Sequence, residues 1–441
     1  MASDEPLFNL KAVVQQTGLK PDTLRAWERR YGLPSPVRSG GGHRLYTRRD
    51  IEVLRWLMAR QHEGLSISRA VDLWRQMEAG GGDTLPMPLP PSSTAEPRFG
   101  GGMLDRLRQE WLAACLAYDG RRAEQAVAQA FALYPPETVC LELLQRALAQ
   151  VGDLWQQGTA TVQQEHLATE LAIRQLEALL MAAPPATRPG QILAACPPQE
   201  YHTFGLLLLT LLLRRRGWAV VYLGANVPTE QLEATVAAVR PDLVILAALR
   251  LPSAVALLET ARALQGRVSI GYGGGVFNSL PALRSRIPGH FLGESVEVAS
   301  RVVDSLMSGP RPAPGGEPIP AEARVALEHF RELRGLIEAK MGQAASAMGL
   351  SAWHLAHAHE EFALHLEAAL ALGDVALLDT GIAGVEQRLV QEGMPAGNLA
   401  RYLHAYCQVA EEQLDERGDL ILAWLRRVTS SRLPDRLGGL E

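Results

Sequence analysis

The chain has 441 residues, of which 47% are hydrophobic and 21% charged, a balance that is ordinary for a soluble globular protein of several domains. The four cysteines are widely spaced and form no CxxC pair, which excludes a disulfide framework and favours a reducing, cytoplasmic compartment. The longest apolar run, residues 206–213, is too short to cross a bilayer, and the first residues lack a signal-peptide pattern, so we expect no membrane partner.

Charge is spread unevenly along the chain. Residues 1–80 contain 13 Lys and Arg against 9 Asp and Glu, whereas residues 321–441 contain 11 against 18. A basic N-terminal part suits a nucleic-acid partner, and an acidic C-terminal part does not.

Two segments rich in glycine, proline and small polar residues divide the chain. Residues 79–102 and 309–320 cannot bury enough apolar surface to fold alone, and we expect flexible or extended linkers there. The predicted domains are residues 1–78 for DNA binding, 103–185 as a helical bundle, 190–308 as alternating strands and helices, and 321–441 as a C-terminal helical domain.

The N-terminal region has the pattern of a winged helix-turn-helix. One short helix ends before Gly18, and a second begins at Pro21 with Leu24 and Trp27 facing inward. The segment SGGGHRLY is typical of a wing, and two further helices are expected at 50–61 and 66–77. The residues that we expect to contact DNA from the second helix and the wing are Lys20, Thr23, Arg25, Arg29, Arg38, His43, Arg44 and Tyr46.

The stretch TLRAWERRYGLPSPVRSGGGHRLY resembles the MerR family of winged-helix regulators over about residues 7–77. The resemblance implies binding to double-stranded operator DNA as a dimer or a larger homo-oligomer. MerR proteins often dimerise through a coiled coil after the DNA-binding part, but a Gly/Pro-rich segment follows here, so oligomerisation must come from elsewhere. A basic helical protein-interaction domain is the alternative interpretation.

The middle of the chain changes its hydrophobic period near residue 190. Residues 103–182 have apolar residues at helical spacing, which predicts about four helices in a bundle. From 190 onward short buried strands alternate with helices, which predicts a Rossmann-like, doubly wound parallel sheet. Its ligand crevice would lie at the carboxyl ends of the strands, where His202 and the glycines 273–275 are expected.

The segment QEYHTFG at 199–205, followed by YLGANVP and GGG, resembles the cobalamin-binding domain, whose motif is DxHxxG. The resemblance implies that His202 is the lower axial ligand of cobalt and that Glu200 holds the other imidazole nitrogen. It also implies that Gly205 leaves space for the nucleotide tail of the cofactor. Gly274 and Gly275 would let the cofactor approach the backbone at the same edge.

The chain departs from this family pattern at two places. Glu200 replaces the aspartate of the motif, and Ala247 and Ala248 stand where a serine commonly contacts the nucleotide. A histidine at a strand–helix junction can also have a purely structural role, which is the alternative for His202.

The segment WQQGTATVQQEH at 155–166 resembles light-responsive cobalamin repressors of the CarH and LitR type. The resemblance implies that Trp155 covers the upper face of adenosylcobalamin, with Glu165 and His166 close by. In that family the histidine can take the upper axial position on cobalt after the adenosyl group leaves. The alternative is that Trp155 is an ordinary core residue of the bundle.

Together these resemblances imply a light-responsive transcriptional regulator, expected to be a repressor, that assembles as a homo-oligomer on DNA. We expect no enzyme, because no catalytic triad or phosphate-binding loop is recognised. The alternatives are a light-independent sensor of cobalamin availability, a corrinoid methyl carrier, and a photoreceptor that uses another chromophore.

Residues 321–430 lie outside these resemblances and are expected to form four or five amphipathic helices. The histidines at 354, 357 and 359 precede Glu360 and Glu361, but their spacing does not place all three on one helix face. We therefore interpret them as part of a solvated face rather than a metal site. Oligomerisation, partner binding and a second sensory role all stay open for this region.

Overall fold

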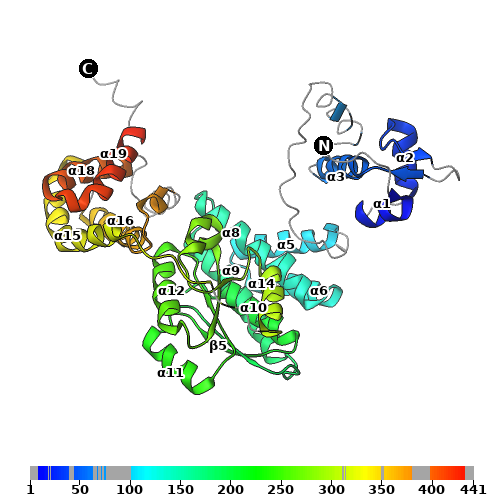
Figure 1. The fold of residues 1–441 in the computed structure, drawn as a ribbon, viewed down its shortest axis with the longest axis horizontal. Coiled ribbons are helices and arrows are strands. Elements are labelled where there is room, and N and C mark those ends of the chain that lie inside the picture. Colours follow the sequence, from blue (N-terminus) through cyan, green and yellow to red (C-terminus); the bar gives the residue numbers. More distant parts are fainter. Residues whose placement is uncertain are drawn as a thin grey trace. The chain divides into compact units, whose positions relative to one another are not determined.

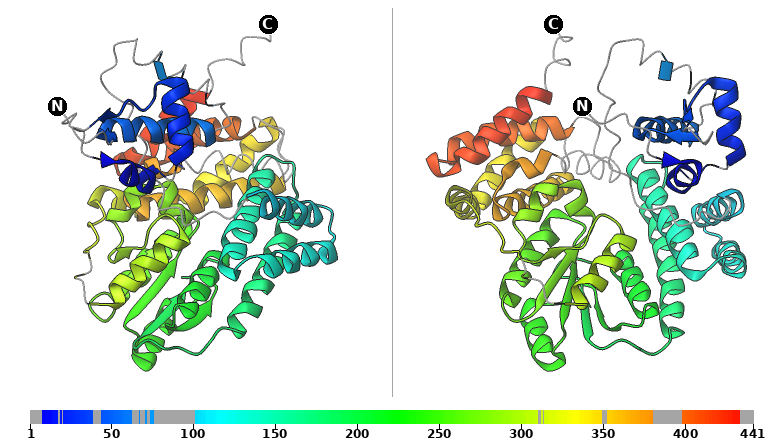
Figure 2. Two further views of the ribbon diagram at one scale, coloured as in Figure 1. Left: turned by 90° about the vertical axis from the view of Figure 1, so that its right-hand side faces the viewer. Right: turned by 45° about the vertical axis from the view of Figure 1, so that its right-hand side comes forward.

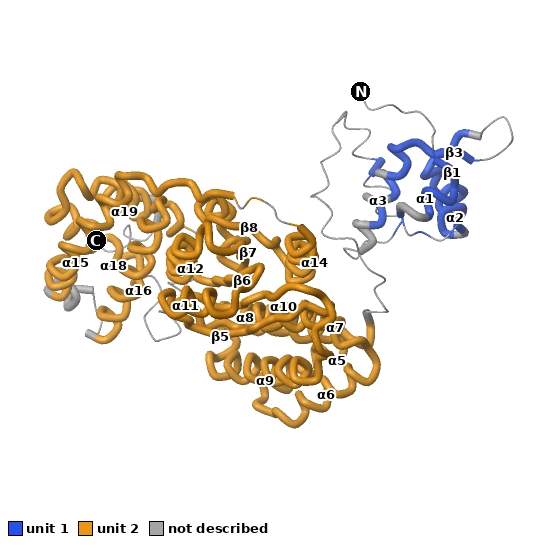
Figure 3. The backbone as a smooth tube through the Cα atoms, turned by 60° about the horizontal axis from the view of Figure 1, so that its bottom comes forward, with its two compact units in different colours: residues 1–97 blue, residues 98–441 orange. Residues whose placement is uncertain are grey.

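The computed structural model describes residues 8–17, 19, 21–38, 44–62, 67, 71, 74–75, 101–309, 312, 314–348, 352–379 and 398–432. The chain forms two compact units, residues 1–97 and residues 98–441 (Figure 3). None of the helices within these described ranges is long and apolar enough to cross a membrane.

The first unit is a small winged helix-turn-helix. Its helices are α1 (Leu10–Thr17), α2 (Pro21–Tyr31) and α3 (Arg48–His62). Its antiparallel sheet has the order β1-β3-β2, with β1 (Phe8–Asn9), β2 (Val37–Arg38) and β3 (Arg44–Tyr46). Leu24 and Trp27 are buried, as the sequence predicts. The helix expected at 66–77 lies mostly outside the described residues.

The second unit begins with a helical bundle. It contains α5 (Gly101–Leu116), α6 (Gly120–Leu133), α7 (Pro136–Thr138), a π-helical segment (Val139–Gln145), α8 (Arg146–Gln156) and α9 (Val162–Met181). The three helical segments between Pro136 and Gln156 are contiguous and form one helix, so the bundle has four helices. Apolar residues of helix α10, among them Leu207 and Leu211, join the bundle core and connect it to the sheet that follows.

A doubly wound parallel sheet follows the bundle, which confirms the predicted fold class. Its strands, in the spatial order β5-β4-β6-β7-β8, are β5 (Ala219–Gly224), β4 (Gln191–Ala195), β6 (Leu243–Ala247), β7 (Ser269–Gly273) and β8 (His290–Phe291). Side chains of β4 alternate between the two faces, with Ile192 and Ala194 in one apolar core and Leu193 and Ala195 in another.

Helices cover both faces of the sheet (Figure 1). The helices on the first face are α10 (Phe204–Arg215) and α14 (Val296–Met307), and those on the second are α11 (Thr229–Val239) and α12 (Leu251–Leu264). A short helix α13 (Gly275–Ser279) follows β7. Strand β5, which follows β4 in the sequence, lies on one side of β4, and β6 lies on the other side. The topological switch point is therefore between the carboxyl ends of β4 and β6.

The C-terminal region is a helical module packed on the sheet domain. It contains α15 (Ala321–Met348), α16 (Ala352–Ala371), α18 (Asn398–Gln413) and α19 (Asp419–Arg432), with 3-10 turns at Val375–Leu377 and Glu416–Gly418. Helix α16 lies against α12, on the second face of the sheet (Figure 2). One continuous apolar core joins the sheet, α12 and the module.

The segment before this module is more ordered than its composition predicts. The amide of Gly289 donates to the carbonyl of Pro314 at 3.0 Å, and the amide of Glu317 donates to the carbonyl of Ser285 at 2.8 Å. The guanidinium of Arg286 donates to the carbonyl of Pro318 at 2.8 Å. Residues 314–320 are therefore extended, which is one of the two forms expected for this segment, and hydrogen bonds hold them on the sheet domain. Helix α5 starts at Gly101, slightly before the predicted end of the first linker.

The histidines of α16 also differ from the sequence interpretation. His359 is only 7% exposed, and its Nδ1 atom lies 2.8 Å from the hydroxyl of Tyr402. His354 and His357 flank the exposed ring of Trp353, which stacks on His357. The predicted solvated face is thus wrong for His359, because it points into the module. Within the described ranges, no group of three or more His, Cys, Asp and Glu residues is arranged to hold a metal ion.

Candidate functional site

The first candidate site is a carboxylate–imidazole pair in the loop between β4 and α10. Glu200 Oε1 accepts a hydrogen bond from the backbone amide of His202 at 2.9 Å and lies 2.7 Å from the Nδ1 atom of the same histidine. The carboxylate is fully buried, whereas the His202 side chain is 55% exposed. Because Glu200 occupies Nδ1, the nitrogen left for an external ligand is Nε2.

The second oxygen of Glu200 binds residues that follow β6, on the other side of the switch point. Oε2 accepts hydrogen bonds from the Leu249 amide and the Ser253 hydroxyl, both at 2.6 Å. Burial alone would raise the pKa of Glu200, but hydrogen bonds from His202, Ser253 and Leu249 outweigh that effect and lower the pKa to about 2. The carboxylate is therefore ionised and joins the ends of β4 and β6.

The loop after β5 fixes the same segment from the other side. The Asn226 side-chain oxygen accepts from the amide of Gln199 at 2.9 Å, and the Asn226 amide donates to the carbonyl of Glu200 at 3.0 Å. Both Gln199 and Asn226 have left-handed backbone conformations, with φ of 66° and 51°. Hydrogen bonds thus connect the loops that follow β4, β5 and β6 next to His202.

The three glycines at this edge of the sheet differ in whether the fold requires a residue without a side chain. A Cβ atom at Gly274, whose φ is 118°, would lie 2.1 Å from the carbonyl oxygen of Ala248, so the fold itself requires glycine there. A Cβ atom at Gly205 would meet no atom within 4 Å, and one at Gly275 would only touch Leu249. No packing among the described residues explains Gly205, since the space beside it is open.

The bundle contributes a second carboxylate–imidazole pair. His166 Nδ1 lies 2.8 Å from Glu165 Oε2, and Glu165 Oε1 accepts from the Thr169 hydroxyl at 2.8 Å. Glu165 stands in the first turn of α9 and His166 directly follows it, and the helix begins with a capping box formed by Thr161 and Gln164. The His166 side chain is 72% exposed. No described hydrogen bond or ion pair joins this pair to Glu200 and His202.

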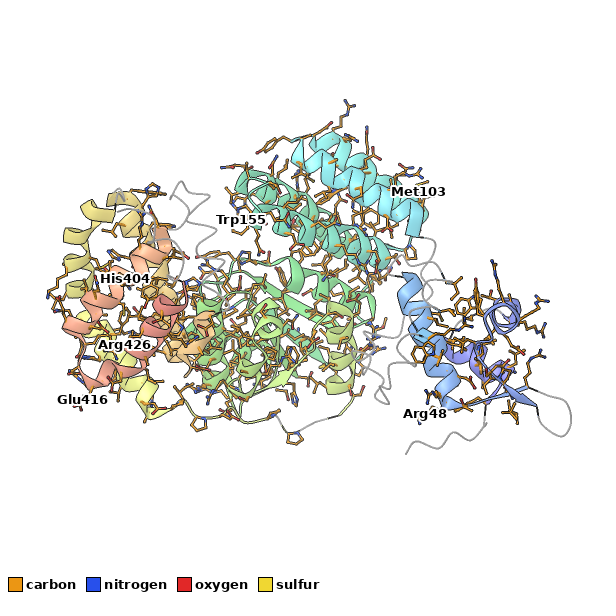
Figure 4. All side chains as sticks on the ribbon, turned by 90° about the horizontal axis from the view of Figure 1, so that it is seen from above. Arg48, Met103, Trp155, His404, Glu416 and Arg426 are labelled. Carbon is orange, nitrogen blue, oxygen red and sulfur yellow. The ribbon has the colours of Figure 1, made fainter. Side chains whose placement is uncertain are left out.

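Trp155 lies in the last turn of α8 (Figure 4). Its side chain is half-buried, and it is not a member of the buried core of the bundle. The bundle therefore covers this large aromatic ring only in part.

The residues predicted to contact DNA differ in exposure. Arg25 and Arg29 are exposed on α2, and Thr23 is half-buried there. Arg44 is partly engaged, since its Nε atom lies 3.0 Å from a carboxylate oxygen of Glu28.

Tyr46 corrects the sequence interpretation. It is 0% exposed, because it occupies an inward position of β3 and packs in the core of the unit, so its ring cannot contact DNA. Lys20 and His43, and the side chain of Arg38, lie outside the described residues.

Sequence reasoning missed Ser253 and Asn226, which hold Glu200 and its loop in place. The only signal for Asn226 was its position in the segment YLGANVP after a predicted strand. Ser253 had no signal of its own, because it approaches Glu200 only through the order of the strands.

Family models match three segments of the chain. Residues 8–76 match the MerR HTH family regulatory protein, and residues 107–180 and 190–303 each match a B12 binding domain. These matches end before the C-terminal module.

Two curated proteins of Myxococcus xanthus are similar to the chain. The HTH-type transcriptional repressor CarH is 35% identical over 295 residues, which are 66% of this chain and 96% of CarH. The HTH-type transcriptional repressor CarA is 34% identical over 246 residues, 55% of this chain and 77% of CarA. Among solved structures, the monomethylamine corrinoid protein of Methanosarcina barkeri aligns with 46% of this chain and 98% of its own, at 18% identity and a TM-score of 0.40. The chain belongs to the family of MerR-type transcriptional regulators with a B12-binding domain that includes the repressors CarH and CarA.

Proposed function

We propose that this regulator is a light-responsive repressor whose cofactor is adenosylcobalamin, held between the helical bundle and the sheet domain. The observation that carries the proposal is the Glu200–His202 pair at the topological switch point. A half-exposed imidazole, oriented by a buried and ionised carboxylate, is prepared to bind cobalt through Nε2 as the lower axial ligand. Gly205 leaves space beside it for the nucleotide tail.

The upper side of the site is assigned to the bundle. Trp155 covers the adenosyl group, and Glu165 holds Nδ1 of His166 so that Nε2 of His166 is left for a ligand. When bound, adenosylcobalamin supplies a weak cobalt–carbon bond that visible light breaks. If light removed the adenosyl group, Trp155 would lose that contact, and the exposed His166 would be the side chain that could bind in its place.

The output of the switch is DNA binding in the cytoplasm. Arg25 and Arg29 on α2 carry the positive charge for operator phosphates and base edges. A cofactor can shift the equilibrium between DNA-bound and free forms only if it binds one form better. In the proposed switch the dark cofactor favours the homo-oligomer that binds DNA, and light favours its dissociation.

The test uses the full chain prepared with adenosylcobalamin in the dark. Its absorption spectrum, molar mass and affinity for operator DNA are measured before and after green light. We expect all three to change together. A spectrum that changes while mass and affinity do not would contradict light control and favour a sensor of cobalamin availability.

A second candidate is a photoreceptor with another chromophore, favoured by Ala247 and Ala248. Neither residue has a hydroxyl for the nucleotide tail, and Ala248 is completely buried. If the chain binds no cobalamin in the dark test but takes up another pigment, this candidate replaces the first.

A further inference from the structure

The C-terminal module packs on α12, and the first turn of α12 is the part of this helix that reaches Glu200. Helix α16 packs along α12, and their buried side chains belong to one apolar core. The residues involved include Leu251 and Ala254 on α12 and Leu355 and Ala358 on α16. The first turn of α12 also provides Ser253, which binds Glu200.

An ion pair joins the two helices at this point. Arg250, which caps the N-terminus of α12, has its Nη2 atom 3.6 Å from Oε2 of Glu361 on α16. The side chains are 37% and 15% exposed, and both facing atoms are buried. Water therefore screens this pair less than it screens the surface pairs of the chain.

The backbone of Arg250 belongs to the turn that holds the Glu200 carboxylate. Its amide lies 3.2 Å and its carbonyl oxygen 2.9 Å from Ser253 Oγ, which is 2.6 Å from Glu200 Oε2. The preceding amide, that of Leu249, donates to the same carboxylate oxygen. A displacement of Arg250 would move both hydrogen-bond donors to the Oε2 atom of Glu200.

The entry to the C-terminal module is fixed as well. Residues 314–318 are hydrogen-bonded to residues 285–289 of the sheet domain, and Arg286 forms an ion pair with Glu317 at 3.5 Å. The module is therefore held both at its entry and along α16, so Glu361 has a defined position over α12.

We propose that the C-terminal module sets the strength of the bond between His202 and cobalt. Glu361 is the positioning residue, and it acts through Arg250 and the first turn of α12 on Glu200, which orients the imidazole. This inference rests on the proposed role of His202 as the lower axial ligand. It gives the C-terminal module a regulatory role at the cofactor site.

The test measures how easily the imidazole leaves cobalt. The full chain is loaded with cyanocobalamin and titrated with cyanide, which displaces the lower ligand and changes the absorption spectrum. In Glu361→Gln we expect the half-point of the titration to fall about two- to fivefold, the range that the loss of one such ion pair allows. Glu361 is the preferred site because it lies on the C-terminal module, whereas Arg250 is near the site itself.

A matched control lies on the same helix. Glu367 on α16 pairs with Arg331 at 2.8 Å and Arg334 at 3.2 Å, both on α15 inside the module. Glu367→Gln removes the same charge and should leave the half-point unchanged. The exchanged pair, Arg250→Glu with Glu361→Arg, should recover most of the loss seen in either single reversal, which excludes misfolding as the cause.

Two outcomes distinguish a failure of this inference from a failure of the proposed ligand role of His202. If His202→Ala changes the spectrum of the bound cofactor while Glu361→Gln leaves the half-point at the wild-type value, the inference is wrong and the ligand assignment holds. If His202→Ala leaves the spectrum unchanged, the ligand assignment itself fails.

Discussion

The two carboxylate–imidazole pairs of this protein have nearly the same contact and opposite surroundings. Nδ1 lies 2.7 Å from the carboxylate in Glu200–His202 and 2.8 Å in Glu165–His166. The first carboxylate is fully buried between strand ends, whereas the second is 30% exposed in the first turn of a helix.

The surroundings determine how firmly each imidazole is held. Glu200 receives bonds from two backbone amides, a hydroxyl and the imidazole, and its pKa falls to about 2. Glu165 receives one hydroxyl besides its histidine. A buried, multiply bonded carboxylate holds its imidazole in one position, and a surface pair leaves its side chain able to change position at low cost. This contrast suits one fixed axial ligand and one that binds only after illumination.

The largest expected effect is on cofactor binding in the dark. His202→Ala should weaken the affinity for adenosylcobalamin by roughly 10- to 100-fold, since even residues that only orient a metal ligand contribute that much. His166→Ala should leave the dark affinity within about threefold. Equilibrium dialysis in the dark measures both, and equal effects of the two variants would remove the proposed distinction between the imidazoles.

The next effect is on the stability of the cofactor-free chain. Because folding lowers the pKa of Glu200 from 4.5 to about 2, the ionised carboxylate stabilises the fold above pH 4.5, and this contribution is lost as the pH falls toward 2. Glu200→Gln should therefore lower the unfolding free energy at pH 7 by on the order of 3 kcal/mol. Chemical denaturation at several pH values checks this. A difference from wild type that stayed constant between pH 7 and pH 3 would contradict the assignment.

Ser253→Ala should have a smaller effect on the same quantity. It removes one hydroxyl bond to a buried charge, which contributes about 2 kcal/mol. A matched control is Ser285→Ala, which removes an exposed serine–glutamate bond of 2.9 Å to Glu317 and should cost less than 1 kcal/mol, roughly the value of a surface contact. Similar losses in both variants would mean that burial does not strengthen the Glu200 cluster.

The sequence carries the parts of this fold that depend on local patterns. Helical spacing and short apolar strands predict the bundle and the doubly wound sheet, because side-chain period follows from backbone geometry. The contact between Glu200 and His202 is equally local, since only Tyr201 lies between them in the sequence. Their other partners are not local: Leu249 and Ser253 reach Glu200 only because β6 lies beside β4.

Two expectations are wrong for different physical reasons. Tyr46 was expected to contact DNA from the predicted wing, and His359 was expected on a solvated helix face, but both side chains point into cores. Residues two apart in a strand point to the same face of the sheet, whereas neighbouring residues point to opposite faces. The sequence of a short wing strand therefore does not show which of its faces is buried, and Tyr46 lies on the buried one. His359 is accommodated inside a helical module because Tyr402 supplies a hydroxyl at 2.8 Å.

The smallest expected effect on stability is that of the exposed pair, and it is the most specific for the proposed switch. Glu165→Gln should change the unfolding free energy by less than 1 kcal/mol, roughly the value of a surface pair. It should nevertheless slow or reduce the binding of His166 to the cofactor after illumination, because the imidazole loses the group that orients Nδ1.

Glu170→Gln, at an exposed position of the same helix, is the matched control, and its spectrum should change on illumination as that of the wild type does. Absorption spectra recorded during green illumination compare the three proteins. If Glu165→Gln destabilised the dark protein as strongly as Glu200→Gln, burial would not distinguish the two pairs, and the assignment of one fixed and one exchangeable imidazole would have to be abandoned.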